Sequence, residues 1–173
     1  FAMVMTTLVG CGKEEAVKTG FAVITSADHS SKDAGEKDGL AQADSTVAAV
    51  LVNKKGVIVD AVVDVIQTKI NFDTNGEITT DLATKYVSKR ELGDAYNMKR
   101  ASEIGKEWFE QADAFEKYII GKPLAEVKGI ALEDGYPTST DLTASVTMNI
   151  TDLIAAVEKA VNSAEEIGAT AKD

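Results

Sequence analysis

The clearest pattern along the chain is a run of Val, Ile and Ala with interspersed polar positions over residues 45–70. The sequence Asn-Lys-Lys-Gly at residues 53–56 divides this run into two halves, which predicts a β-hairpin with a tight turn. A shorter apolar run over residues 20–27 predicts another strand. Residues 28–43 are rich in Gly, Asp and Lys and lack periodicity, so they predict a surface loop.

The second half of the hairpin contains two carboxylates, Asp60 and Asp64. Because side chains alternate across a strand, both are expected on the same face as Ile58, Val62 and Ile66. Such a mixed face predicts either a solvated surface or the wall of a cleft.

Helical periodicity begins near residue 88. Ser88 and Glu91 have the spacing of a capping box and predict a short helix within residues 88–98, ended by Gly93. Residues 103–121 predict an amphipathic helix because six apolar residues fall on one stripe. The members of this stripe are Ile104, Trp108, Phe109, Ala112, Phe115 and Ile119.

A last amphipathic helix is predicted over residues 149–168, with Asn149 or Thr151 as its N-cap and Gly168 at its C-terminal end. A short helical turn is expected at residues 124–128. Strands therefore cluster early in the chain and helices later. This order predicts an α+β fold, in which helices pack on an antiparallel sheet.

Four residues between the hairpin and the first helix have two interpretations: Asp73, Asn75, Gly76 and Glu77. Oxygen ligands and a Gly bend are what a calcium loop needs, but the full series of ligands is missing. A plain β-turn explains the same residues and is the favoured interpretation.

Length and charge narrow the class of protein. The chain has 173 residues, which predicts one domain, residues 19–173, behind an N-terminal segment of residues 1–18. The formal net charge is −10, and clusters of Lys and Arg that neutralise phosphates are lacking, so no nucleic-acid partner is expected. No apolar run reaches the roughly 18 residues that a membrane-spanning helix requires.

The single cysteine, Cys11, has three interpretations: a buried apolar residue, a nucleophile or a lipidation site. A nucleophile needs a base, and the one histidine, His29, lies in a polar stretch without obvious partners. The sequence around Cys11 is not periodic enough for a core position. Lipidation is therefore the favoured interpretation.

The sequence Leu-Val-Gly-Cys at residues 8–11 resembles the lipobox of bacterial lipoproteins. This resemblance implies that Cys11 is acylated and anchors the protein to the extracellular face of the cell membrane. Residues 1–10 then resemble the end of a signal peptide, and residues 12–18 form a polar tether. The charged start of a signal peptide is missing, so the true N-terminus is expected upstream of Phe1.

No catalytic motif is visible. The sequence contains no Gly-x-Ser-x-Gly, no phosphate-binding loop and no His/Cys metal cluster, and the protein is not expected to be an enzyme by itself. Trp108 is expected in the core, with stacking against a ligand as the alternative.

The segment 141–161 carries a resemblance to a known family. Asp141 is followed six residues later by Thr147 and then by an amphipathic helix. This resembles the FMN-binding domain family, known from flavin-carrying subunits of bacterial Rnf and sodium-pumping quinone reductase complexes. There the motif is Asp-x-x-Ser/Thr-Gly/Ala-Ala-Thr. The Thr hydroxyl takes FMN through a phosphoester bond, and the Asp belongs to the signature that the flavin transferase recognises.

Asp141 and Thr147 match that motif in identity and spacing, whereas Ala144, Ser145 and Val146 depart from it. The resemblance implies cofactor-binding roles for Thr147 and Asp141, with Thr143 and Ser145 beside them. An ordinary turn with a buried Thr147 is the alternative, and in that case Asp141 has a local capping role with Thr138.

The resemblance extends more weakly to the hairpin at residues 47–63 and the aromatic helix at residues 107–122. The whole chain is similar to clostridial-type membrane-anchored lipoproteins described as a major membrane immunogen. Together these resemblances imply an extracytoplasmic, lipid-anchored electron carrier that binds FMN and exchanges electrons with a redox partner protein. The alternative is a non-catalytic surface lipoprotein that binds a small molecule or a partner protein.

Overall fold

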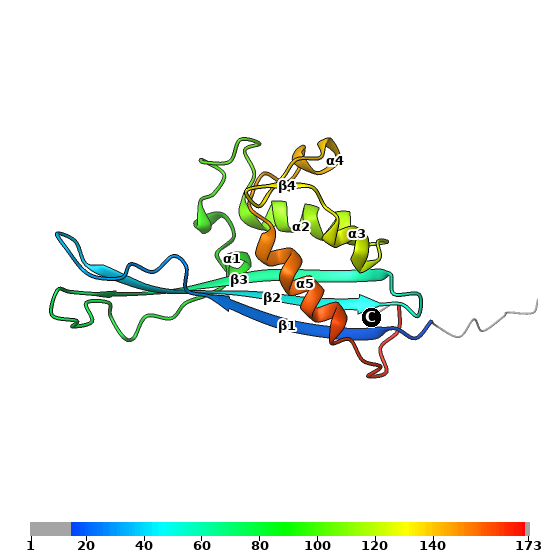
Figure 1. Cartoon of the computed structure of the whole chain (residues 1–173), viewed down its shortest axis with the longest axis horizontal. Helices are drawn as coiled ribbons and strands as arrows, with labels where there is room; N and C mark the ends of the chain where they lie inside the picture. Colours follow the sequence, from blue (N-terminus) through cyan, green and yellow to red (C-terminus); the bar gives the residue numbers. More distant parts are fainter. Residues whose placement is uncertain (1–14, 172–173) are drawn as a thin grey trace, which may run out of the picture.

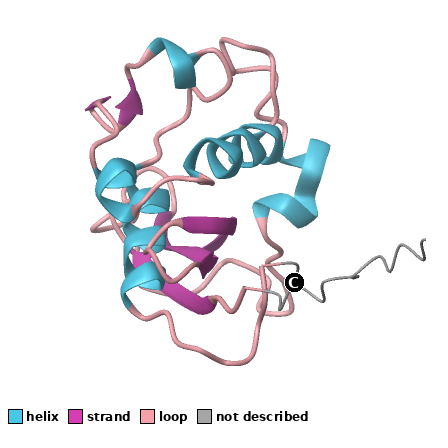
Figure 2. Cartoon of the chain, turned by 90° about the vertical axis from the view of Figure 1, so that its right-hand side faces the viewer, coloured by secondary structure: helices cyan, strands magenta, loops and turns pink. Residues whose placement is uncertain are grey.

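The computed structural model describes residues 15–171 and has an α+β fold, as the sequence predicts. A three-stranded antiparallel sheet consists of β1 (Lys18–Ser26), β2 (Gly39–Val52) and β3 (Ile58–Phe72), in that order. Two twelve-residue helices, α2 (Trp108–Ile119) and α5 (Thr151–Asn162), lie on one face of this sheet (Figure 1). Figure 2 views the strands end-on and shows helices above them and to their left.

Shorter elements connect these parts. They are α1 (Lys89–Leu92), the 3-10 helix η1 (Gly93–Tyr96), α3 (Leu124–Lys128), β4 (Leu132–Glu133), β5 (Tyr136–Pro137) and α4 (Thr140–Thr143). In the part of the chain that the structure describes, no helix has the length and apolar character needed to cross a bilayer.

The predicted hairpin is confirmed. The Asn53 side chain accepts hydrogen bonds from the Lys55 and Val57 N–H groups, and Gly56 has φ +77°, which favours glycine. The prediction of a loop up to residue 43 is wrong, because residues 39–44 pair with residues 67–72 and extend β2.

The predicted face of β3 is correct for Asp60, Val62 and Asp64 but wrong for Ile58. A bulge shifts the register so that Leu51 opposes Asp60 while the next residue, Val52, opposes Ile58. Because one extra residue lies between these pairs, the side chain of Ile58 turns to the helix-covered face and is fully buried.

The helix-covered face forms the core. α5 packs on β1 and β2, whereas α2 packs on β3. At Gly20 of β1 the strand lies so close to α5 that an added Cβ would stand 2.0 Å from the Ala160 carbonyl oxygen. Only glycine permits this approach, which brings α5 down onto the sheet.

Both long helices are shorter than predicted. α2 begins at Trp108, because the buried Glu107 is its N-cap and forms a capping box with Glu110. Ile104 therefore lies in the preceding loop, which forms part of the cleft described below.

α5 begins after Ile150 as N-cap and ends with Ser163 as C-cap. After Ser163 the chain leaves the helix and bonds to the main chain at the start of β1. The Thr19 N–H donates to Glu165 O (2.8 Å), and the Val17 N–H donates to Ala169 O (3.2 Å). Gly168, expected at the helix end, lies in this returning segment.

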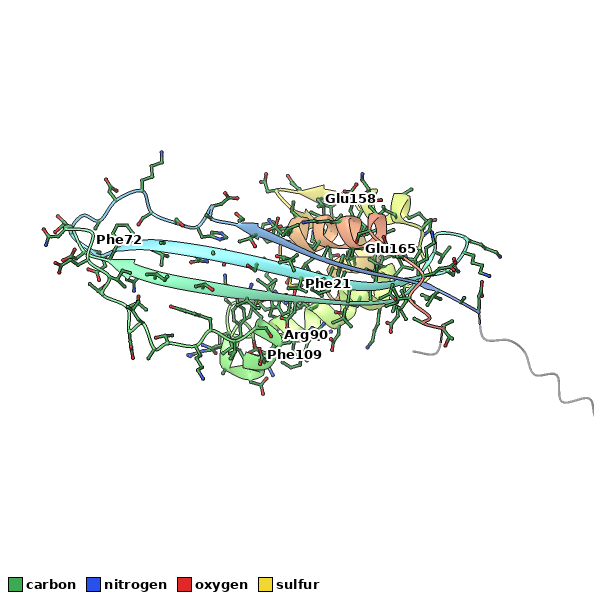
Figure 3. The ribbon with its side chains drawn as sticks, turned by 90° about the horizontal axis from the view of Figure 1, so that it is seen from below. Phe21, Phe72, Arg90, Phe109, Glu158 and Glu165 are labelled. Atoms are coloured by element: carbon green, nitrogen blue, oxygen red, sulfur yellow. The ribbon has the colours of Figure 1, made fainter. Side chains whose placement is uncertain are left out.

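Within residues 15–171 no helix lies on the opposite face of the sheet, which Figure 3 shows from below. Phe21 is 63% exposed and Val62 is 52% exposed on this face. The cross-strand register places Ala49 between them.

The outer edges of the sheet are occupied by side chains from the helices. At β1, Lys159 Nζ donates to Val23 O (2.8 Å) and Ser163 Oγ donates to Phe21 O (3.3 Å). At β3, the Val63 N–H donates to Glu116 Oε1 (2.7 Å). Main-chain groups at both edges therefore have partners outside the sheet.

The far end of the sheet, where the start of β2 pairs with the end of β3, extends beyond the helices, and the loop after β1 is hydrogen-bonded to β2 there (Figure 1). There His29 Nδ1 lies 2.5 Å from Asp44 Oδ2, and Gln42 and Gln67 donate to the same carboxylate. Burial alone would raise the pKa of Asp44, but these hydrogen bonds and the charge of His29 hold it below its ordinary value of 3.8. His29 thus has a structural partner.

The turn interpretation of residues 73–77 is confirmed, since Asp73 Oδ1 accepts the N–H groups of Asn75 (2.8 Å) and Glu77 (2.9 Å). Within residues 15–171 no group of three or more His, Cys, Asp or Glu side chains is placed to hold a metal ion.

Candidate functional site

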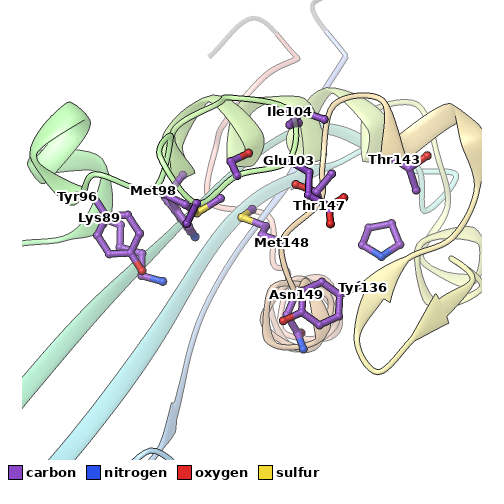
Figure 4. A pocket seen from close by; sticks show the side chains of 14 residues that line it. Lys89, Tyr96, Met98, Glu103, Ile104, Tyr136, Thr143, Thr147, Met148 and Asn149 are labelled. Carbon is purple, nitrogen blue, oxygen red and sulfur yellow. The ribbon is translucent and has the colours of Figure 1, made fainter.

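A cleft of about 960 Å³ lies at the N-terminal ends of α2 and α5. One wall comes from α1, η1 and the loop at residues 98–104, and the other from the β4–β5 hairpin and residues 143–149. Figure 4 shows Lys89 and Tyr96 at one end of the cleft and Thr143 at the other. Its size is in the range of pockets for small ligands.

The loop wall is shaped by a buried carboxylate. Glu107 accepts hydrogen bonds from the N–H groups of Met98 (2.8 Å) and Lys99 (3.2 Å). Asn97 and Gly105 adopt positive φ angles of 59° and 62°, which turn the chain at both ends of the loop. One side chain therefore fixes both the start of α2 and the loop that faces the cleft.

Gln111 joins the two walls. It is fully buried on α2, where its Nε2 donates to Ser102 Oγ (3.0 Å) in the loop wall. Its Oε1 accepts the Thr147 N–H (2.8 Å) and the Thr147 hydroxyl (3.4 Å) in the opposite wall. This amide holds Thr147 in a fixed position, with its hydroxyl beside the cleft.

The β4–β5 hairpin contributes Tyr136 and Pro137 to the cleft. Its Asp134-Gly135 turn has positive φ angles of 50° and 86° at both central residues, as tight hairpin turns require. Asn149 Nδ2 donates to Asp134 O (3.1 Å), which attaches the hairpin to the segment before α5. Tyr136 is half exposed at the rim.

An aromatic surface forms the opposite end of the cleft. The Lys89 ammonium lies 4.8 Å from the centre of the Tyr96 ring and 5.3 Å from the Trp108 ring. Both distances are in the range of cation–π contacts. Trp108 is 4% exposed, so it contributes to the core and to the cleft wall together.

Arg90 anchors α1 next to this surface. It donates to Val63 O (2.7 Å) and forms ion pairs with Asp113 (2.7 Å) and Glu116 (2.5 Å) on α2. Burial raises the pKa of Glu116 above its ordinary value, although the Val63 N–H and Arg90 oppose this change. α1 is therefore fixed to β3 and α2 by a charged network.

Of the four residues to which the resemblance assigns cofactor-binding roles, the structure places Thr147 and Thr143 in the cleft lining, where Trp108 also lies. Thr147 is half-buried. Ser145 lies outside the lining and its hydroxyl donates to Leu142 O (3.3 Å), whereas Asp141 is exposed on α4. Cys11 lies outside the described residues.

The start of α5 differs from expectation. Its N-cap is Ile150, and Asn149 Oδ1 accepts the Thr151 N–H (3.0 Å), so this N–H is not free for a ligand. Asp152 lies in the first turn and adds a negative charge there. A phosphate bound near Thr147 would meet fewer free donors than an open helix N-terminus offers.

The sequence arguments missed Gln111, Glu107, Lys89 and Tyr136. Gln111 had a detectable signal, because it is a polar residue inside the apolar stripe of α2, between Trp108 and Phe115. Lys89 and Tyr136 reach the cleft through a cap and a turn, and Glu107 supports the loop wall from behind, so the positions of all three in space depend on the tertiary fold.

Comparison with known proteins gives one short similarity. A stretch of 41 residues, 24% of this chain, is 51% identical to part of a chlorophenol reductase from Desulfitobacterium hafniense. The match spans 12% of that protein's length. No protein-family model matches the chain, and no solved structure matches it.

Proposed function

We propose that this cleft binds FMN and that the protein is a lipid-anchored electron carrier on the outer face of the cell membrane. The observation that carries the proposal is the position of Thr147. The residue that the FMN-binding motif assigns to flavin attachment lines a cleft of ligand size, and its main chain is fixed by Gln111.

The lining suits a planar cofactor. Trp108, Tyr96 and Tyr136 provide aromatic surface, and Met98 and Met148 provide adaptable apolar contacts. Thr143, Thr147 and Asn149 add a few polar groups along one wall. The other wall adds Lys89, Ser102 and Glu103, so the lining combines aromatic and apolar surface with polar groups that can orient a ligand.

The side chains have distinct roles in this proposal. FMN, when bound, supplies reversible electron transfer. Thr147 holds its phosphate, Gln111 orients Thr147, and the aromatic residues bind the ring and exclude water from it. The acylated Cys11 keeps the domain near its redox partners.

A second candidate is a surface lipoprotein that binds another small molecule in the same cleft. Ala144, Ser145 and Val146 favour it, because they replace the residues of the flavin-attachment motif. Val146 is fully buried, so the larger side chain is accommodated in the core and leaves the cleft open.

The test is coexpression of the chain with a flavin transferase, followed by denaturation and in-gel fluorescence. Fluorescence that survives denaturation is expected in the wild type and in Thr143→Ala, and is expected to be lost in Thr147→Ala. Thr143→Ala is the matched control because it removes a hydroxyl from the same cleft. FMN titration monitored by the single tryptophan, Trp108, measures binding that is not covalent. Absence of both signals in the wild type would favour the second candidate.

The lipid anchor has a separate test. Mass spectrometry of protein from its native membrane is expected to show a diacylglyceryl group on Cys11 and no residues before it. An intact peptide across Gly10–Gly12 would contradict the anchor without bearing on FMN.

A further inference from the structure

Lys89 carries a positive charge into the cleft without a carboxylate partner. Within residues 15–171, no ion pair or hydrogen bond of its ammonium group is found, and its neighbours are the Tyr96 and Trp108 rings. Arg90, the next residue, pairs with two carboxylates. Because the chain has a net charge of −10, carboxylates outnumber cations, and a lysine without a carboxylate partner is unexpected.

The position of Lys89 is set by its neighbours in the chain. Ser88 and Glu91 form a reciprocal capping box around it, and Arg90 fixes the same turn to β3 and α2. The residue is half-buried, and its ammonium lies over the two rings. Such a cation is preorganised for a negative charge that arrives in the cleft.

The other charged residue of the lining is Glu103. Figure 4 draws Glu103 and Thr147 well apart from Lys89, so the cleft has its cation at the aromatic end. If the phosphate of the ligand is attached at Thr147, its ring would therefore lie at the aromatic end of the cleft, next to Lys89.

We propose that Lys89 holds the negative charge that the isoalloxazine ring of FMN gains on reduction, and so raises the reduction potential of the bound flavin. The proposal rests on the proposed function. Two electrons and one proton enter the ring, which leaves one additional negative charge. In the test the electrons come from dithionite or an electrode. A cation near the ring stabilises the reduced state more than the oxidised state.

The experiment compares the full chain with Lys89→Met, Lys89→Arg and Lys99→Met after loading with FMN. Lys89→Met keeps an apolar stem over the rings but removes the charge, whereas Lys89→Arg keeps the charge. Lys99→Met is the matched control, because Lys99 is exposed and outside the cleft lining. Thermal unfolding of each variant checks that the fold is intact.

The expected result for Lys89→Met is a tenfold smaller preference for reduced over oxidised flavin, which lowers the two-electron potential by about 30 mV. Lys89→Arg and Lys99→Met are expected to stay close to the wild type. Riboflavin, which lacks the phosphate, is expected to show the same dependence on Lys89 as FMN.

Three outcomes overturn the inference. If Lys89→Met binds flavin with the wild-type potential, Lys89 does not act on the ring, and FMN binding itself still stands. If Lys89→Met weakens FMN but not riboflavin, the cation serves the phosphate. If the wild type binds neither flavin, the proposed function fails and this inference fails with it.

Discussion

Replacement of Phe115 by alanine is expected to lower the free energy of unfolding by about 3–5 kcal/mol. Phe115 is fully buried at the centre of α2, on the face that packs against β3. The smaller side chain loses its contacts and leaves a cavity, because a layer of helix on sheet cannot collapse around the missing ring. Urea unfolding followed by Trp108 fluorescence measures the change.

Phe109→Ala is the matched control for this prediction. Phe109 is on the same helix and is only partly buried, so its loss is expected to cost about 1–2 kcal/mol. Equal losses for the two variants would contradict the orientation of α2 on the sheet.

Gln111→Leu is expected to destabilise the fold by about 2–4 kcal/mol, because it removes partners from two walls of the cleft, each worth roughly 1–3 kcal/mol. The Thr147 N–H loses its acceptor and Ser102 Oγ loses a donor. Leucine fills a similar volume, so the effect arises from polar groups. The same substitution is expected to weaken FMN binding by about tenfold, because Thr147 is no longer held in place.

Gln67→Leu is the control that separates the loss of stability from the loss of FMN affinity. Gln67 donates to Asp44 at the far end of the sheet, away from the cleft lining. It is expected to lower stability without changing the affinity for FMN, measured by titration at a temperature where both variants are folded. Unchanged FMN affinity in Gln111→Leu would show that Gln111 supports the fold alone.

The sequence predicts that a strand or helix forms better than it predicts the residues at which that element begins and ends. Asn53 and Gly56 identify the β2–β3 turn because its geometry depends on local residues. The start of β2 is polar, with Gln42 and Asp44, and becomes a strand because β3 pairs with it across the sheet. Such pairing between distant residues leaves little local signal.

The residues of the cleft also divide into those with a local signal in the sequence and those without one. Thr147 is found through a motif and Trp108 through helical periodicity, and both line the cleft. Lys89 and Tyr136 reach it from a capping box and from a hairpin turn whose local chemistry says nothing about their neighbours in space. The site is therefore assembled by tertiary packing, and the sequence identifies only the residues that also belong to a periodic or motif pattern.

The side chains along the sheet edges bear on how the protein behaves at high concentration. An open sheet of three strands presents unpaired main-chain groups to which the strand of another molecule can be added, a first step towards fibrils. Lys159 and Ser163 occupy carbonyls at β1, while Glu116 and Arg90 occupy both main-chain groups of Val63 at β3. We therefore expect a second molecule not to add its strand at these covered positions, even at high concentration, and the Lys159, Arg90 and Glu116 side chains that cover them also attach the helices to the sheet.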